Sequence, residues 1–128
     1  MNIELEQNKR TAMAFYELAF NQHQPAEAVR LYIGPSYKQH NPEVDDGPEA
    51  FIQFVTGFCA RFPQLHLDIK RAIAEDDLVI LHVHAKMFPE DRGAAIFDMF
   101  RFENGKIVEH WDAIQPIPEH SENSNTMF

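Results

Sequence analysis

Residues 94–116 read AAIFDMFRFENGKIVEHWDAIQP and contain two strand-like segments on either side of Asn104-Gly105. Asn-Gly between such segments indicates a β-hairpin, because a type I′ turn needs positive φ at both central residues. Counting outward from this turn pairs Phe100 with Glu109 and Asp98 with Trp111. The shared face is then predicted to hold Ile96, Asp98, Phe100, Phe102, Ile107, Glu109, Trp111 and Ala113. Asp98 would therefore be a carboxylate in an apolar wall, where it must find a partner or change its pKa.

The composition is that of a globular protein with ample material for a core. The 128 residues are 45% hydrophobic and include eleven Phe, which argues against a disordered chain. A net charge of −9 makes a nucleic-acid or anionic-membrane partner unlikely. No apolar run approaches the ~20 residues that cross a bilayer. With one cysteine, Cys59, no internal disulfide forms, and we expect a reduced, cytoplasmic protein with Cys59 in the core.

The first half of the chain shows helical periodicity. Apolar residues recur at helical spacing within residues 3–21. Residues 25–33 predict a short second helix that begins with Pro25 and is ended by Gly34-Pro35. Residues 36–48, SYKQHNPEVDDGP, have the composition of a loop, and a third helix is predicted from Pro48 to Phe62.

The second half of the chain alternates as β-strands do. Strands are predicted at residues 65–70 and 78–87, followed by the hairpin of residues 94–116. Helices followed by antiparallel strands predict an α+β domain with helices on one face of a curved sheet. We expect residues 1–128 to form one domain, with 117–128 as a C-terminal tail.

Asp98 and two histidines are the first candidates for chemistry. Asp98 is either a structural aspartate, paired with a basic residue or Trp111, or a general acid/base with a raised pKa. His82 and His84 share one face of strand 78–87. One interpretation is that both are polar residues on a solvated face. A second is that they chelate a metal ion. A third is that His84 faces a pocket and acts together with Asp98. His110 is predicted on the face away from Asp98 and outside the site.

The loop and the end of the hairpin add further candidates. Tyr37 and His40 are either part of the turn chemistry of the loop or hydrogen-bond donors at a pocket. Glu109 is either a second pocket carboxylate or the ion-pair partner of an arginine such as Arg101 or Arg92. Neither a phosphate-binding glycine loop nor a nucleophile motif is present.

Three segments together resemble a known family. The run FDMFRFENGKIVEHWDAIQPIPE is similar to the C-terminal signature of SnoaL-like polyketide cyclase domains, in the nuclear-transport-factor-2-like superfamily. The loop YKQHNPEVDDGPEAF resembles the matching upstream segment. The tail SENSNTMF resembles one bacterial branch, described as predicted aldol-condensation-catalysing enzymes. The resemblance implies a cone-shaped α+β barrel, with three helices wrapping a curved antiparallel sheet around a pocket, and commonly a dimer.

The resemblance also implies roles for particular residues. In such cyclases an aspartate acts as general acid/base in an aldol ring closure with a histidine nearby, and these positions fall on Asp98 and His84. We accordingly expect Asp98 and His84 to be catalytic. Ligand-binding residues are expected to be Tyr37, His40, Phe100, Glu109 and Trp111.

These residues define the expected function. The substrate is expected to be a small hydrophobic carbonyl compound, turned over without a cofactor or metal by aldol cyclisation, isomerisation or dehydration. A non-catalytic binding module of the same fold and a metal enzyme using His82 and His84 are the alternatives.

Two further expectations concern the outside of the domain. The second hairpin face, with Phe97, Met99, Val108 and Ile114, is apolar and predicts a homodimer through the sheet. The polar tail is expected to be ordered by docking of Phe128, at the pocket mouth or on the partner near residues 39–42.

Overall fold

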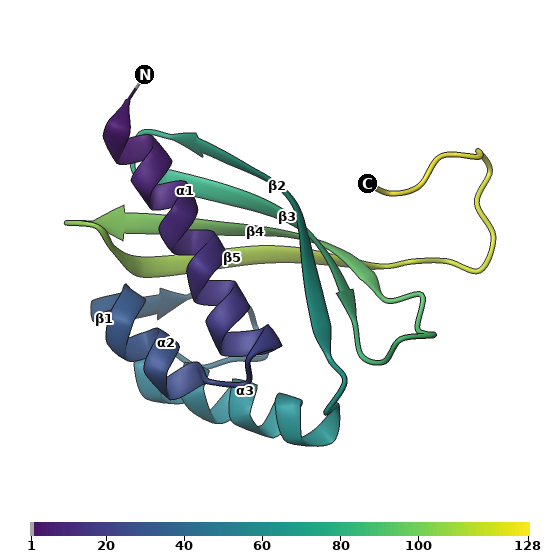
Figure 1. The fold of residues 1–128 in the computed structure, drawn as a ribbon, viewed down its shortest axis with the longest axis horizontal. Helices are drawn as coiled ribbons and strands as arrows, with labels where there is room; N and C mark the ends of the chain where they lie inside the picture. The colour runs from purple at the N-terminus through teal and green to yellow at the C-terminus, as the bar shows by residue number, and fades with distance from the viewer. Residues whose placement is uncertain (1) are drawn as a thin grey trace.

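The computed structural model describes residues 2–128 as a curved five-stranded sheet with helices on one face (Figure 1). In chain order the elements are α1 (Ile3–Tyr16), a π-helix (Glu17–Asn21), α2 (Pro25–Tyr32), β1 (Ile33–Gln39), α3 (Pro48–Arg61), β2 (His66–Glu75), β3 (Leu78–Lys86), β4 (Ala94–Glu103) and β5 (Lys106–Pro116). The strand order is β1-β5-β4-β3-β2. The expected α+β fold with a curved sheet and three helices is confirmed.

The helices begin and bury their residues as the sequence predicts. Asn2 caps α1, since its side chain accepts a hydrogen bond from the Glu4 amide at 2.9 Å. The predicted helix over residues 3–21 is continuous, but its last five residues are a π-helix. Proline at the first turn opens both α2 and α3. No helix in residues 2–128 is both long and apolar enough to span a membrane.

The sheet is mixed, because β1 joins it. Strands β2 to β5 form an antiparallel meander, as expected. β1 instead pairs parallel with β5, with Lys38 beside Glu109 and Gln39 beside His110. The predicted loop over residues 36–48 rested on its content of Pro, Asp, Asn and Gly, but its first residues, with Gly34 and Pro35 before them, belong to β1. An edge position tolerates them, since only one side of the strand must be hydrogen-bonded.

A β-bulge near the start of β5 changes which side chains share a face. Phe102 pairs with Ile107, but the next residue of β4, Arg101, pairs with Glu109, so Val108 is the extra residue. The predicted pairings of Asp98 with Trp111 and of Phe100 with Glu109 are therefore wrong. Asp98 lies opposite Asp112, and Phe100 lies opposite His110.

Gly34 explains why the bulge fits. A Cβ atom on Gly34 would lie 2.9 Å from Cγ1 of Val108, so only glycine leaves room for this side chain. Val108 is buried within the chain at 2% exposure, and its predicted place on an outer dimer face is wrong. The predicted place of Ile114 on that face is also wrong, because the bulge pairs Ile114 with Ile96 on the face of Asp98.

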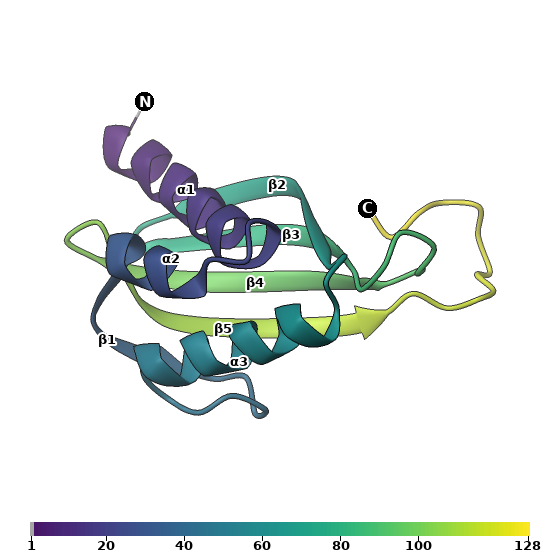
Figure 2. The same cartoon turned by 60° about the horizontal axis from the view of Figure 1, so that its bottom comes forward.

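The core lies between the helices and the inner face of the sheet (Figure 2). Phe15 of α1 packs against Phe51 of α3 with ring centroids 5.0 Å apart, and edge-on against Phe100 of β4 at 6.0 Å. Cys59 is buried in this core, as predicted.

The segment after Pro116 turns back onto the sheet (Figure 1). Phe128 packs against His84 with ring centroids 4.5 Å apart. The prediction that Phe128 is docked is confirmed, but it docks on the outer face of its own sheet and not beside residues 39–42. Ring stacking and a hydrogen bond from Arg71 hold it there.

Candidate functional site

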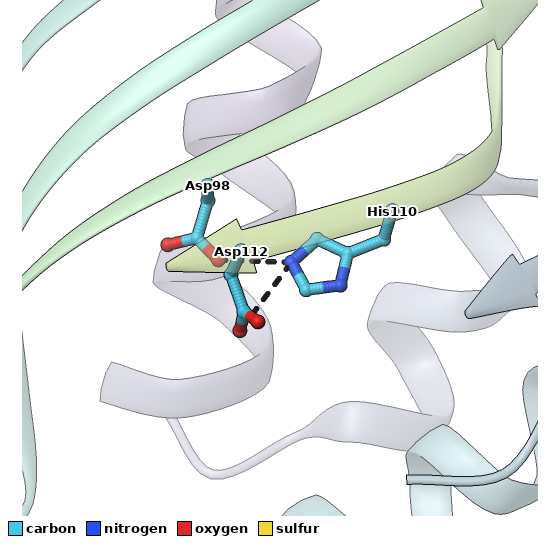
Figure 3. A group of neighbouring side chains, drawn as sticks. All are labelled: Asp98, His110 and Asp112. Carbon is cyan, nitrogen blue, oxygen red and sulfur yellow. Dashed lines mark hydrogen bonds and ion pairs between the residues drawn. The ribbon is translucent and has the colours of Figure 1, made fainter. Parts of the chain in front are cut away.

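Asp98 lies at the centre of a buried polar cluster on the inner face of the sheet. It sits in the middle of β4 and is 1% exposed. Its Oδ1 accepts a hydrogen bond from the hydroxyl of Tyr16, at 2.5 Å, and lies 2.8 Å from Nε2 of His110. The bulge in β5 brings His110 and Asp112 to this face (Figure 3). Our prediction that His110 faces away from Asp98 is therefore wrong.

The other oxygen of Asp98 is unpartnered. Within residues 2–128, neither Asp98 Oδ2 nor the Tyr37 hydroxyl has a hydrogen-bond partner, although both are buried. Buried polar atoms in native proteins are almost always hydrogen-bonded, so such exceptions point to a place where another molecule completes the site.

Burial sets the protonation of these groups. It raises the pKa of Asp98, while the hydrogen bonds from His110 and Tyr16 oppose that rise. Burial and the charge of Asp98 raise the pKa of both Tyr16 and Tyr37. Both phenols therefore stay protonated at neutral pH and act as donors.

The loop after β1 fixes His110. Gln39 Oε1 accepts a hydrogen bond from the main-chain N–H of Asn41 at 3.0 Å and lies 2.7 Å from His110 Nδ1. Because this oxygen is an acceptor, Nδ1 carries a proton. His110 Nε2 and Asp98 Oδ1 then share one further proton across their 2.8 Å contact.

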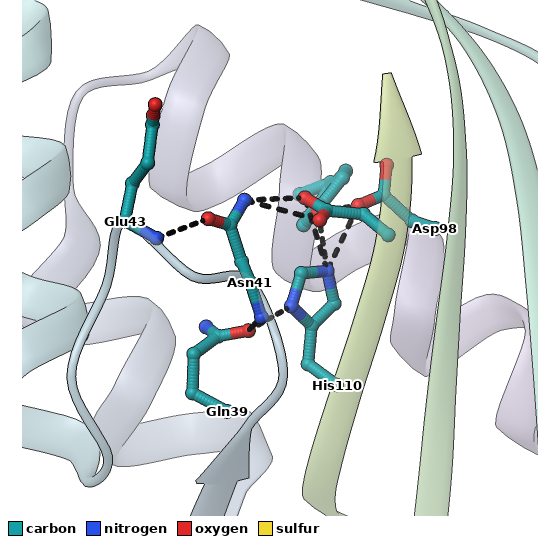
Figure 4. A network of polar contacts seen from close by, with 7 residues as sticks. Gln39, Asn41, Glu43, Asp98 and His110 are labelled. Carbon is teal, nitrogen blue, oxygen red and sulfur yellow. Dashed lines mark hydrogen bonds and ion pairs between the residues drawn. The ribbon is translucent and has the colours of Figure 1, made fainter.

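The same loop fixes the second carboxylate. Asn41 Oδ1 accepts a hydrogen bond from the Glu43 amide at 2.8 Å (Figure 4). This bond turns Asn41 Nδ2 toward Asp112. Nδ2 lies 3.0 Å from both oxygens of Asp112. Asp112 Oδ2 is also 3.9 Å from His110 Nε2, so the same imidazole nitrogen faces two carboxylates, Asp98 and Asp112.

This cluster also has the composition of a metal site. Asp98, His110 and Asp112 each offer a ligand atom, and these atoms lie within 4.8 Å of one another. Gln39 would hold His110 Nδ1–H, as outer partners of metal-bound histidines do.

The structure divides the predicted site residues among three places. Tyr37 and Phe100 lie with Asp98 on the inner face, where both rings neighbour His110, with centroids at 6.4 and 5.1 Å. His84 pairs with Ala95 on the outer face, so its predicted partnership with Asp98 is wrong. Side chains alternate along a strand, and Asp98 shares its face with Leu81 of β3 instead.

The remaining three form a separate outer cluster. Glu109 accepts from Arg101 Nε at 2.7 Å, which confirms the ion-pair alternative, and it lies 2.7 Å from His40 Nε2. The His40 ring is stacked on Trp111, with centroids 4.7 Å apart and planes at 4°. The prediction that Trp111 and Glu109 share the face of Asp98 is wrong because of the bulge at Val108.

The two histidines of the metal alternative each have one ring nitrogen engaged. His82 Nδ1 contacts the guanidinium of Arg71, and His84 Nε2 lies 2.9 Å from the carbonyl oxygen of Arg92. Within residues 2–128, the buried Nε2 of His82 has no hydrogen-bond partner.

Sequence reasoning missed Tyr16, Gln39, Asn41, His110 and Asp112 as a group. Tyr16 was read only as one of the apolar residues on the buried face of the first helix. The positions of the other four residues depend on the bulge in β5 or on the pairing of β1, neither of which was predicted. The alternation of His110 with Asp112 was the available signal for two polar side chains on one face.

Comparison with known proteins agrees with this architecture. The sequence model of the SnoaL-like polyketide cyclase family matches residues 10–118. No curated protein matches the chain.

Several solved structures share the fold. One is a candidate polyketide cyclase from Acidithiobacillus ferrooxidans, with a TM-score of 0.71 and 18% identity over 89% of this chain and 91% of that chain. AclR, a candidate hydroxylase from Streptomyces galilaeus, has a TM-score of 0.68 and 20% identity over 89% and 82%. A candidate ketosteroid isomerase from Kribbella flavida has a TM-score of 0.71 and 12% identity over 98% and 90%.

Proposed function

Because this chain belongs to the SnoaL-like polyketide cyclase family, we propose that it is a cofactor-free enzyme that transfers a proton next to the carbonyl group of a small hydrophobic compound. Aldol cyclisation, isomerisation and dehydration all begin with that step. The observation that carries the proposal is the unpartnered Oδ2 of the buried Asp98. A carboxylate with a raised pKa and one free oxygen is suited to remove such a proton.

The neighbours of Asp98 supply the rest of the chemistry. Tyr16 and His110 hold Oδ1 and so aim Oδ2. The proton moves from the substrate carbon to Oδ2, and the electron pair of the C–H bond becomes the enolate. Tyr37, whose hydroxyl is unpartnered, donates a hydrogen bond to the enolate oxygen. The protonated Asp98 then returns a proton to the product.

Access to this site requires side-chain movement. Asp98 is 1% exposed, and Tyr16, whose hydroxyl it binds, packs edge-on against Phe100 with ring centroids 5.2 Å apart. A substrate with a planar apolar ring replaces contacts of the same kind and reaches a carboxylate that is already shielded from water.

The test is exchange of α-protons for deuterium in a ketone. The protein is added to 2-tetralone in D₂O and loss of the α-proton signal is followed by NMR. We expect exchange by the wild type, and a rate lower by roughly 100-fold or more for Asp98→Asn. Asp68→Asn, at an exposed position on β2, is the matched control and should retain the rate.

Two further experiments test the metal-enzyme and binding-module alternatives. Dialysis against EDTA should leave the exchange rate unchanged, whereas a fall restored by a divalent cation would favour a metal held by Asp98, His110 and Asp112. Tight binding of ketones without any exchange over a broad panel would favour the non-catalytic binding module.

We further propose that the protein forms a homodimer through the outer face of the sheet. Phe97 is 54% exposed there, and Met99 and Trp111 lie on the same face. Apolar side chains of this size at the surface favour an interface.

A further inference from the structure

A second cluster lies on the outer face of the sheet, on the side opposite to the Asp98 carboxylate. Its centre is the ring of Phe128, which lies 4.5 Å from the His84 ring at 25° and 5.3 Å from the His82 ring. Arg71 Nη2 donates a hydrogen bond to the main-chain oxygen of Phe128 at 2.7 Å. The outer face of the sheet therefore binds both the aromatic ring and the main-chain oxygen of Phe128.

The surface beneath this ring is rigid. His82 is 6% exposed and lies nearly parallel to the Phe97 ring, with centroids 4.3 Å apart and planes at 7°. Burial and the nearby charge of Arg71 lower the pKa of His82. His82 is therefore a neutral flat ring at physiological pH, in contact with Phe97 on the neighbouring strand and with Phe128 of the tail.

The surroundings are cationic, although the chain as a whole is acidic. Lys70 Nζ lies 5.5 Å from the centroid of the Phe128 ring. Lys86 and Arg92 line an adjoining cavity of about 750 Å³ together with His84. Three carboxylates lie nearby: Asp68 is paired with Lys70, Asp91 accepts from the Met87 amide, and Glu90 lines the cavity. Lys70, Arg71, Lys86 and Arg92 therefore exceed them by one positive charge. In a chain of net charge −9, this local excess of positive charge favours an anion.

The tail depends on few groups to stay in place. Ser121, Asn123 and Thr126 make hydrogen bonds with main-chain N–H groups of the tail itself. The end of the tail is held mainly by Phe128. Met127 lies near Phe97 and Ala113 of the sheet. A free molecule that offers the same ring and oxygen can therefore compete with the tail.

We propose that this outer-face cluster is a binding site for planar aromatic carboxylates, and that Phe128 is its internal, displaceable occupant. The aromatic ring of the ligand stacks on His82 and His84, and its carboxylate takes the hydrogen bond of Arg71. Residues of the tail, including Thr126, Met127 and Phe128, also line the adjoining cavity, so displacement of the tail widens it for ligands larger than a phenylalanine side chain. This site does not depend on the chemistry proposed for Asp98.

The probe is 3-phenylpropionate, with binding measured by calorimetry and by NMR shifts of the histidine rings. Phe128→Ala and a chain lacking residues 126–128 should bind it at least tenfold more tightly than the wild type, because the internal competitor is gone. The uncharged 3-phenylpropanol should bind at least tenfold more weakly than the acid. Equal affinities for the wild type and both variants, or for acid and alcohol, would overturn the proposal.

Arg71 provides the residue-specific test. In the Phe128→Ala background, Arg71→Gln should weaken binding of the acid at least tenfold while leaving binding of the alcohol unchanged. Arg10→Gln, an exposed change on α1, removes the same charge elsewhere and should leave both affinities unchanged. Circular dichroism confirms that each variant is folded. An equal loss of affinity in the two arginine variants would show that only net charge matters and would refute the site.

Discussion

Asp98 links stability to pH through its burial. Its pKa is higher in the folded chain than in the unfolded chain, so the folded state binds more protons between the two values. The free energy of unfolding therefore falls as the pH rises from the ordinary aspartate range through the folded pKa. Asp98→Asn removes this dependence. In melting experiments from pH 4 to pH 7, the variant should gain in melting temperature relative to the wild type. A difference that does not change with pH would contradict the burial argument.

Tyr16 lowers the pKa of Asp98, which burial raises. Its hydroxyl donates to Asp98 Oδ1 at 2.5 Å and favours the charged form. Tyr16→Phe keeps the ring contacts but removes this donor, so the pKa of Asp98 should rise further. In a plot of exchange rate against pH, the acidic limb should then move to higher pH. The maximum rate should fall by less than tenfold. Tyr32→Phe, on α2, serves as control, and an unchanged limb in Tyr16→Phe would exclude this role.

At the scale of elements, the contact between β1 and the bulge in β5 leaves no room for a side chain at position 34. Gly34→Ala would place a Cβ atom 2.9 Å from Val108, and such overpacking costs about 1–3 kcal/mol. We expect a lower urea midpoint for Gly34→Ala and partial recovery in Gly34→Ala/Val108→Ala.

Gly57 offers the matched comparison. A Cβ on Gly57 meets no atom within 4 Å, and Gly57 lies inside helix α3. Gly57→Ala should therefore stabilise the protein by about 0.5–1 kcal/mol. If Gly34→Ala were as stable as Gly57→Ala, Val108 would not need the space that glycine provides.

The sequence predicted those elements whose signals are local. The helices, the meander and the Asn104-Gly105 turn follow from periodicity and turn chemistry, and the buried position of Asp98 follows from them. The bulge does not, because Ile107 and Val108 are both apolar and either one can continue the alternation. Because of that single extra residue, His110 and Asp112 lie on the face of Asp98, where Glu109 and Trp111 were predicted. β1 was missed for a related reason: its pairing with β5 is parallel and distant in sequence, so no local pattern marks it.

At the scale of the whole molecule, the exposed outer face predicts self-association. Phe97 is 54% exposed on β4, and a charge there should oppose contact between two sheets. We expect the wild type to sediment as a dimer at micromolar concentration and Phe97→Asp as a monomer. Ile3→Asp, an exposed apolar position on α1 at 70% exposure, should remain a dimer. A monomeric wild type would refute the interface.

The parallel pairing of β1 with β5 also constrains the order of folding. Gln39 and His110 are 71 residues apart in the sequence, and Tyr16 and Asp98 are 82 apart. The entropy of closing such long loops is offset only after the meander of β2 to β5 provides a surface to join. We therefore expect the polar cluster to be assembled late, in one step, as β1 and α1 settle on a sheet that already exists. Until then a folding chain carries Asp98, His110 and Asp112 on an uncovered sheet, where water hydrates all three.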